Sequence, residues 1–357
     1  MSNITKRILR SSAKPQSLGV VSTPNISLTA SPSLHTSPTQ TPPTPPAPKD
    51  VINIIPRGAK LPNLLPEELK LLHKKQIRLF HDAPNTWASI SGKHLHNALA
   101  ASLIFAQHEA GSAVCIGSAG WVITCAHCFG ETEEEYRAAP TTRWLLFYDG
   151  RAAQVECCAW DPKHDLALLK IIAIESCDAN STGDGDNGVL FPFVALSPRK
   201  PAVNAPIICI GQPGSEDLES TRDQKTDYRL VEVSWGAFRG MIPGTDPCDN
   251  SDIGALKHDA WTYWGHSGAP LLQVVDGALV GLHSSWDDQT GMRHGVPLVA
   301  IEKFLRDHGE VIGGEFFGSD PSASLAGRER GLVQTLVPRP KRGVQAPEEQ
   351  GSVEVIE

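Results

Sequence analysis

Hydrophobic and polar residues divide the chain into two polar ends and a middle of short apolar runs. From about residue 98 to residue 300, glycine, proline and aspartate interrupt these runs at close intervals. Runs of this length, rich in β-branched and aromatic residues, indicate strands, and many of them at such spacing predict an antiparallel barrel or sandwich. The clearest runs are Trp121–Thr124, Trp144–Tyr148, Ala152–Ala159, Leu166–Ile172, Pro206–Ile210, Leu230–Trp235, Leu271–Val275 and Leu279–His283.

Local signals add one hairpin and two helices to this pattern. Asp149-Gly150 separates two of the apolar runs and predicts a tight hairpin turn. Pro66 and two glutamates precede leucines at helical spacing, which predicts a helical N-terminal extension over residues 64–97. Val299–His308 places Ile301, Phe304 and Leu305 on one face and predicts a late helix.

The two polar ends differ from this middle in composition. Half of the first fifty residues are proline, serine or threonine, and residues 1–49 carry five basic and no acidic side chains. Such a segment buries too little apolar surface to offset its chain entropy, so residues 1–63 are predicted to be a disordered leader. Residues 318–357 are again polar and predict a disordered tail, which leaves residues 98–317 as the folded domain.

The cellular location follows from weaker signals. Residues 1–18 are rich in arginine and serine and lack acids, which is also typical of a mitochondrial transit peptide. We favour a plain basic tail, because Pro15 and the following Pro/Thr run keep any amphipathic helix short. Eight cysteines are too few for a disulfide scaffold, and no secretory signal is evident. We therefore expect an intracellular protein, in the cytoplasm or nucleus rather than the mitochondrion.

Charge and hydropathy argue against nucleic acid and against a membrane as partners. The net charge of −8 argues against a broad nucleic-acid-binding surface. The basic run Arg339–Arg342 resembles a degenerate AT-hook, but such short runs more often form a solvated tail or a localisation signal. No apolar stretch reaches eighteen residues, so no membrane-spanning helix is expected.

Three short motifs carry candidate chemistry. His127 ends an apolar run, Asp165 opens another, and Ser267 stands between Gly265 and Gly268. A serine hydroxyl becomes nucleophilic when an imidazole takes its proton, and a buried carboxylate holds that imidazole in one tautomer. Each residue alone has a structural explanation, as a buried histidine or as turn residues. Their order within one β-rich region favours catalysis.

These motifs identify a family resemblance over about residues 98–308. Gly120-Trp121-Val122-Ile123-Thr124 followed by Ala126-His127, Asp165-Leu166-Ala167-Leu168-Leu169-Lys170, and Ser267-Gly268-Ala269-Pro270 resemble a trypsin-like serine peptidase of the chymotrypsin fold. The likeness is greater to the high-temperature-requirement (HtrA) type than to secreted digestive trypsins, and we expect no PDZ module after residue 317. The resemblance implies an all-β fold of two antiparallel six-stranded barrels with a C-terminal helix.

The resemblance also implies roles for the site residues. His127 would be the general base, Asp165 the acid that orients it, and Ser267 the nucleophile. The backbone N–H groups of Gly265 and Ser267 would form the oxyanion hole. The implied activity is a serine endopeptidase that cleaves protein or peptide substrates through an acyl-enzyme and needs no cofactor.

Several positions depart from the family pattern. His266 stands where the family has aspartate or asparagine, and Ala269 replaces the usual second glycine. Trp261 occupies the position, six residues before the nucleophile, where trypsins place an acid that holds lysine or arginine. We therefore expect a small or apolar P1 residue rather than a basic one, in a pocket formed by Trp261, Ser284, Ser285 and Trp286.

Two other functions remain open from the residues alone. A protease-like binding protein with minimal turnover would fit the departures at Trp261, His266 and Ala269. An α/β-hydrolase-type esterase would fit the Gly-His-Ser start of a nucleophile elbow. The esterase is disfavoured because Pro270 leads into a predicted strand, whereas an elbow runs into a helix.

The cysteines beside His127 raise the question of a metal. Cys125, His127 and Cys128 offer zinc-type ligands, but zinc takes four ligands and no second Cys/His pair is evident. A metal would also occupy the imidazole that the catalytic interpretation needs. We therefore expect no metal site, and we expect Cys115 and Cys128, which lie near the position of a disulfide in secreted trypsins, to stay reduced.

Overall fold

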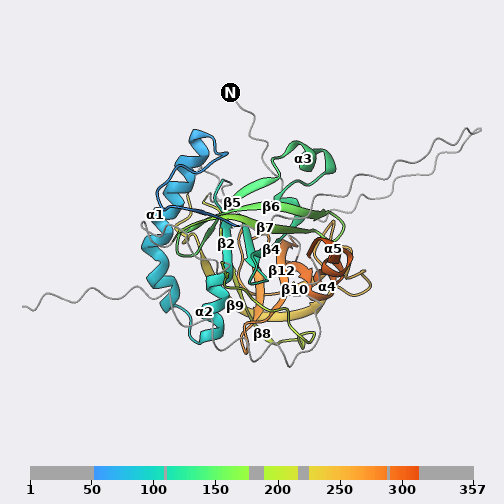
Figure 1. The fold of residues 1–357 in the computed structure, drawn as a ribbon. Coiled ribbons are helices and arrows are strands. Elements are labelled where there is room, and N and C mark those ends of the chain that lie inside the picture. The colour runs from blue at the N-terminus through green and yellow to red at the C-terminus, as the bar shows by residue number, and fades with distance from the viewer. Residues whose placement is uncertain (1–51, 108–110, 177–188, 216–224, 288–289, 313–357) are drawn as a thin grey trace, which may run out of the picture. The chain divides into compact units, whose positions relative to one another are not determined.

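Two closed antiparallel β-barrels form the core of the protein in a computed structural model, which describes residues 52–107, 111–176, 189–215, 225–287 and 290–312. The first barrel has the strand order β7-β4-β3-β2-β5-β6 and closes through pairing of β6 with β7. Its strands are β2 (Ser102–Phe105), β3 (Ser112–Cys115), β4 (Trp121–Thr124), β5 (Thr142–Phe147), β6 (Ala152–Asp161) and β7 (Leu166–Glu175). Figure 1 shows these strands in cyan to green.

The second barrel closes in the order β10-β13-β12-β11-β8-β9. Its strands are β8 (Pro206–Gly211), β9 (Glu232–Met241), β10 (Leu256–His258), β11 (Pro270–Gln273), β12 (Leu279–Trp286) and β13 (Arg293–Pro297). Its interior is a separate apolar cluster that includes Phe238, Leu256, Ala269 and Val280. The predicted all-β, two-barrel fold is confirmed, and a two-barrel domain excludes the α/β-hydrolase alternative.

The predicted local elements are also present. Leu146 pairs with Ala152 across the Asp149-Gly150 turn, where Gly150 has a φ of 86°. The late helix is α4 (Leu298–Asp307), and it buries Ile301, Phe304 and Leu305 as its spacing predicts. The remaining helical elements are α1 (Pro66–Ala88), α2 (Lys93–Ala101), a 3-10 turn (Ala126–Cys128), α3 (Glu133–Ala138) and α5 (Gly309–Ile312). None of the described helices is long and apolar enough to cross a membrane.

Ordered structure begins before the boundary predicted for the leader. β1 (Asn53–Ile55) lies within the predicted segment 1–63 and pairs in parallel with Ala173–Glu175 of β7. Leu61 is 2% exposed, and the carbonyl oxygen of Pro62 accepts a 3.1 Å hydrogen bond from Nε1 of Trp144. The predicted boundary at residue 64 is therefore too late, because the Pro/Thr composition of the earlier residues does not extend to this short apolar run. Residues 1–51 and the predicted tail 318–357 lie outside the described residues.

Helix α1 is fixed to both barrels. Its Leu72 and Leu79 side chains are buried in the large apolar cluster that includes the core of the first barrel. Nε2 of Gln76 donates to the carbonyl oxygen of Gly150 at 3.0 Å, in the hairpin turn of that barrel. Nη2 of Arg78 donates to the carbonyl oxygen of Tyr228, immediately before β9 of the second barrel. The helical extension predicted up to residue 97 continues to Ala101, because the alanines and leucine at its end favour helix.

Candidate active site

His127 lies in the 3-10 turn that ends β4, as the sequence places it. Its Nδ1 atom is 2.8 Å from Oδ1 and 3.0 Å from Oδ2 of Asp165, and its backbone N–H donates to Oδ1 at 3.2 Å. The His127 side chain is 14% exposed. With Nδ1 donating its proton to the carboxylate, Nε2 is the nitrogen that is left to accept a proton.

Asp165 is buried at the start of β7 in an unusual backbone conformation. Its φ is 52°, although it is not glycine, and the residue is 1% exposed. The preceding turn is held by Oδ1 of Asp161, which accepts the N–H groups of Lys163 and His164 at 2.9 and 3.0 Å. Left-handed backbone at a non-glycine residue costs about 1–2 kcal/mol, so the surrounding contacts maintain this position.

A third group completes the surroundings of the Asp165 carboxylate. The hydroxyl of Ser284, on β12, donates to Oδ2 of Asp165 at 2.6 Å. The sequence assigns Ser284 to the substrate pocket, whereas the structure directs its side chain onto the acid. The backbone carbonyl oxygen of Ser284 also accepts a 3.4 Å hydrogen bond from the Ser267 hydroxyl. Ser284 thus contacts both the candidate acid and the candidate nucleophile.

Ser267 lies in a turn between Gly265 and Gly268, whose φ angles are 98° and 81°. The Ser267 carbonyl oxygen accepts the N–H of Ser112 at 2.9 Å, which joins this turn to the first barrel. A Cβ atom at Gly268 would lie 2.1 Å from the Ser112 carbonyl oxygen, so only glycine fits there. Within the described residues no hydrogen bond joins the Ser267 hydroxyl to His127; such contacts are often loose without substrate.

The two predicted oxyanion-hole donors are backbone N–H groups of the turn that carries Ser267. Among the described residues, the N–H groups of Gly265 and Ser267 donate to no other group. The neighbouring Trp264 carbonyl oxygen accepts the N–H of Gly214 at 2.6 Å. Free backbone N–H groups beside a serine hydroxyl are the donors that an oxyanion requires.

His266, the residue before the candidate nucleophile, is a buried part of this turn. It is 0% exposed, and its Nδ1 accepts the N–H of Tyr263 at 3.1 Å. Burial lowers the pKa of His266 to about 4, so the ring is neutral near pH 7. The neutral imidazole therefore stands where the family pattern has aspartate or asparagine, and it stabilises the turn by accepting the Tyr263 N–H.

Two further histidines, His258 and His283, lie close to His266, and no sequence motif groups them. Nε2 of His258 is 3.0 Å from Nδ1 of His283, and the rings of His266 and His283 meet edge to face at 6.3 Å. Burial is the main cause that lowers the pKa of His258 to about 3 and holds the pKa of His283 well below its usual value. The His283 carbonyl oxygen accepts the N–H of Gly268 at 2.8 Å, so this neutral cluster supports the nucleophile turn.

Of the four predicted pocket residues, the two serines make hydrogen bonds and Trp261 makes ring contacts. Ser284 binds Asp165, and the hydroxyl of Ser285 accepts the Gly254 N–H at 3.4 Å. Trp261 packs its ring edge to face with Tyr228 at 4.8 Å and parallel to Tyr263 at 6.3 Å. Trp286 is partly buried. Tyr228, which no sequence motif marks, is thereby part of an aromatic cluster beside the nucleophile turn.

A metal is disfavoured by the chemistry of the available donors. Cys125, His127 and Asp165 place ligand atoms within 4.8 Å of one another, and Cys128 is not in this group. Burial raises the pKa of Cys125 well above that of a free thiol, and nearby Asp165 raises it further. A protonated thiol is a poor ligand, and Nδ1 of His127 already binds Asp165. Seven cysteines lie in the described residues, including Cys115 and Cys128, and all seven are free thiols.

The two closed barrels form a chymotrypsin fold. The first barrel carries the histidine and the aspartate, and the second carries the glycine-flanked serine. Together these features define a serine endopeptidase. Residues 111–282 match the family model of the trypsin-like peptidase domain. Over these residues, just under half of the chain, the sequence is similar to this family.

Several solved protease structures match part of this chain. The serine endoprotease from Yersinia pestis is 19% identical with a TM-score of 0.41, over 61% of this chain and 67% of that one. An inactive form of the Rv3671c protease is 14% identical with a TM-score of 0.42, over 62% and 94%; its serine-to-alanine variant from M. tuberculosis is also similar. The HtrA-type protease AlgW with a decapeptide is 20% identical with a TM-score of 0.38, over 56% and 52%.

Proposed function

We propose that this serine endopeptidase cleaves peptide bonds with Ser267 as nucleophile, His127 as general base and Asp165 as the group that orients His127. The observation that carries this proposal is the pair of contacts between Nδ1 of His127 and the buried carboxylate of Asp165. They fix the tautomer in which Nε2 takes up a proton.

The reaction proceeds in two stages. Oγ of Ser267 attacks the scissile carbonyl carbon while Nε2 of His127 takes the hydroxyl proton, and the N–H groups of Gly265 and Ser267 stabilise the oxyanion. The intermediate collapses to an acyl-enzyme when the C–N bond breaks and His127 returns the proton to the leaving amine. A water molecule then attacks the ester with His127 as base, which releases the new carboxyl end and restores Ser267.

Active-site labelling tests this assignment. A fluorophosphonate probe should label the wild-type protein, and Ser267→Ala should abolish labelling and lower kcat by about five to six orders of magnitude, because members of a triad act as a unit. Ser89→Ala is the matched control, since its hydroxyl contacts Thr86 at the end of α1, outside the candidate site. If folded wild-type protein takes up no probe and cleaves no peptide, the enzyme assignment fails and the binding-protein alternative holds.

We further propose that the P1 residue is small or apolar. Trp261 supplies a ring rather than a carboxylate, and its packing with Tyr228 and Tyr263 leaves no acid in this cluster to pair with lysine or arginine. Cleavage of a mixed peptide library should therefore favour alanine, valine or leucine before the scissile bond. Preferred cleavage after lysine or arginine would contradict the proposal and leave the triad assignment intact.

A further inference from the structure

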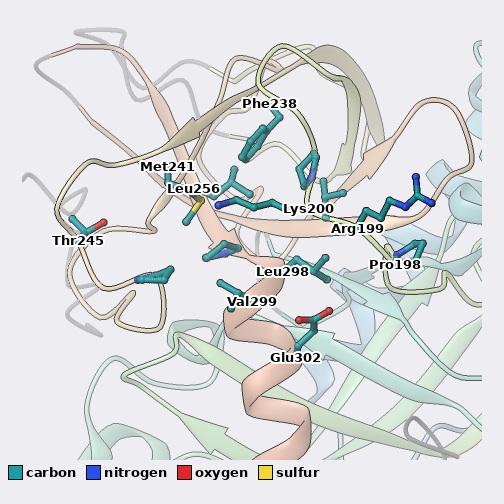
Figure 2. A pocket seen from close by; sticks show the side chains of 14 residues that line it. Pro198, Arg199, Lys200, Phe238, Met241, Thr245, Leu256, Leu298, Val299 and Glu302 are labelled. Atoms are coloured by element: carbon teal, nitrogen blue, oxygen red, sulfur yellow. The ribbon is translucent and has the colours of Figure 1, made fainter. Parts of the chain in front are cut away.

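A cavity of about 580 Å³ lies between the second barrel and the first turns of α4. Residues of β9, β10, β12 and α4 line it, together with the segment 198–201 that precedes the second barrel (Figure 2). None of the lining residues belongs to the candidate active site. A volume of this size is typical of a small-molecule site.

The floor of the cavity is apolar and preformed. Phe238, Leu256 and Val280 are 2%, 1% and 1% exposed, and all three also pack in the core of the second barrel. Met241 and Leu298 extend the same apolar lining. Because the barrel core holds the floor side chains in place, a ligand with an apolar body needs no rearrangement of this surface.

Charged side chains stand above this floor. In Figure 2, Lys200 extends across the apolar lining, Glu302 rises from α4, and Arg199 turns outward. Within the part of the chain that the structure describes, neither the Lys200 ammonium nor the Glu302 carboxylate has an ion pair or a hydrogen bond. The guanidinium of Arg199 likewise has no ion pair or hydrogen bond within these described residues, so the cavity offers two cations and one anion over an apolar surface.

We propose that this cavity binds a small amphipathic monocarboxylate, with its apolar body on the floor and its carboxylate on Lys200. Glu302 disfavours a second negative charge on the ligand, which makes a monocarboxylate preferable to a dicarboxylate of the same length. This binding does not depend on the catalytic assignment, because the two sites share no residue.

Calorimetric titration of the full-length Ser267→Ala protein with octanoate tests the proposal. Affinity should rise by about fourfold per methylene from hexanoate to decanoate until the cavity is full, because each buried methylene adds a similar free energy of transfer. Octan-1-ol, octylamine and octanedioate should each bind more weakly than octanoate. Equal binding of the alcohol or the amine would overturn the role of Lys200, and no saturable binding below the micelle concentration would overturn the site.

Variants locate the binding. Lys200→Gln should weaken octanoate by about threefold to fivefold, the range of a solvent-accessible ion pair, and leave octan-1-ol unchanged. Lys303→Gln removes the same charge from α4 outside the cavity and is the matched control. Val299→Trp, at a position 41% exposed, should fill the cavity and abolish binding without lowering the melting temperature. Octanoate binding that neither Lys200→Gln nor Val299→Trp alters would place the ligand elsewhere and overturn the proposal.

Discussion

The hydroxyl of Ser284 donates a 2.6 Å hydrogen bond to Oδ2 of Asp165, between two residues 119 positions apart in the chain. This bond adds a further contact to a carboxylate that already binds Nδ1 and the backbone N–H of His127. The neighbouring Ser285 has no such contact, since its hydroxyl accepts the N–H of Gly254. Comparing Ser284→Ala with Ser285→Ala therefore distinguishes a role in positioning Asp165 from the general effect of losing a hydroxyl.

Ser284→Ala should lower kcat/KM by about tenfold. A hydrogen bond to a charged group contributes about 1.5–3 kcal/mol, and part of this free energy already stabilises the ground state, so only the remainder lowers the activation barrier. The effect should fall mainly on kcat, since Ser284 acts through Asp165. Steady-state kinetics of Ser284→Ala and Ser285→Ala provide the comparison. Equal losses in the two variants would contradict the positioning role.

Helix α1 should influence the active site through Arg78. Its guanidinium binds the carbonyl oxygen of Tyr228, whose ring packs on Trp261 and Tyr263 next to the nucleophile turn. Arg78→Ala should slow the labelling of Ser267 by about threefold to tenfold, the range of one partly exposed charged hydrogen bond. Arg137→Ala, which removes an exposed pair with Glu133 on α3, should leave the labelling rate unchanged. Slower labelling of Ser267 in both variants would show that the loss of a positive charge, and not the loss of the Arg78–Tyr228 contact, is responsible.

The buried histidines should make the fold sensitive to mild acid. The pKa of His258 is lowered to about 3 and that of His266 to about 4, whereas both rings titrate near 6.5 when the chain is unfolded. Between pH 6.5 and these values the unfolded state binds more protons, so the free energy of unfolding falls as the pH falls. At pH 5 each ring should contribute a loss of about 2 kcal/mol.

His266→Asn tests this dependence, since an asparagine oxygen can replace Nδ1 as acceptor of the Tyr263 N–H. Urea unfolding at pH 7.5, 6 and 5 should show a smaller loss in His266→Asn than in the wild-type protein. His73→Asn, on the exposed side of α1, should retain the full dependence. Parallel curves for the wild-type protein and His266→Asn would refute the contribution of His266.

Gly268 should tolerate no side chain because a Cβ atom there would clash with Ser112. Gly244 has a similar backbone conformation without such a clash and serves as the comparison. Gly268 and Gly244 both have left-handed φ angles, of 81° and 77°, but a Cβ atom at Gly244 would meet nothing within 4 Å. Gly244→Ala should cost about 1–2 kcal/mol from backbone conformation alone. Gly268→Ala adds the clash with Ser112 and should cost more than about 3 kcal/mol and abolish labelling of Ser267. Similar melting temperatures for the two variants would contradict the clash.

Local patterns in the sequence predicted much of this architecture. Alternating and continuous apolar runs marked most of the strands, and Asp149-Gly150 marked a hairpin, because these features depend on neighbouring residues. The three candidate catalytic residues were found from motifs of a few residues each. β10 has only three residues and no periodicity to detect, and β1 is recognisable only by its partner on β7.

The contacts that surround the site were not predictable in the same way. Ser284 was assigned to a pocket because its position follows the family pattern, while its hydroxyl is directed by a carboxylate far away in the sequence. Tyr228 lies 150 residues from Arg78, and His258 lies 25 residues from His283. Such pairs depend on how the two barrels fold, and no short-range pattern encodes them.

The pairing of β1 with the end of β7 bears on how the chain folds during synthesis. β1 and the apolar face of α1 leave the ribosome first, yet Ala173–Glu175 are made about 120 residues later. At roughly 5–20 residues per second, β1 remains without its partner residues for about 6–24 seconds. β1 therefore pairs only after the end of β7 has been synthesised, and in that interval the apolar face of the amphipathic helix α1 is available to a chaperone on the nascent chain.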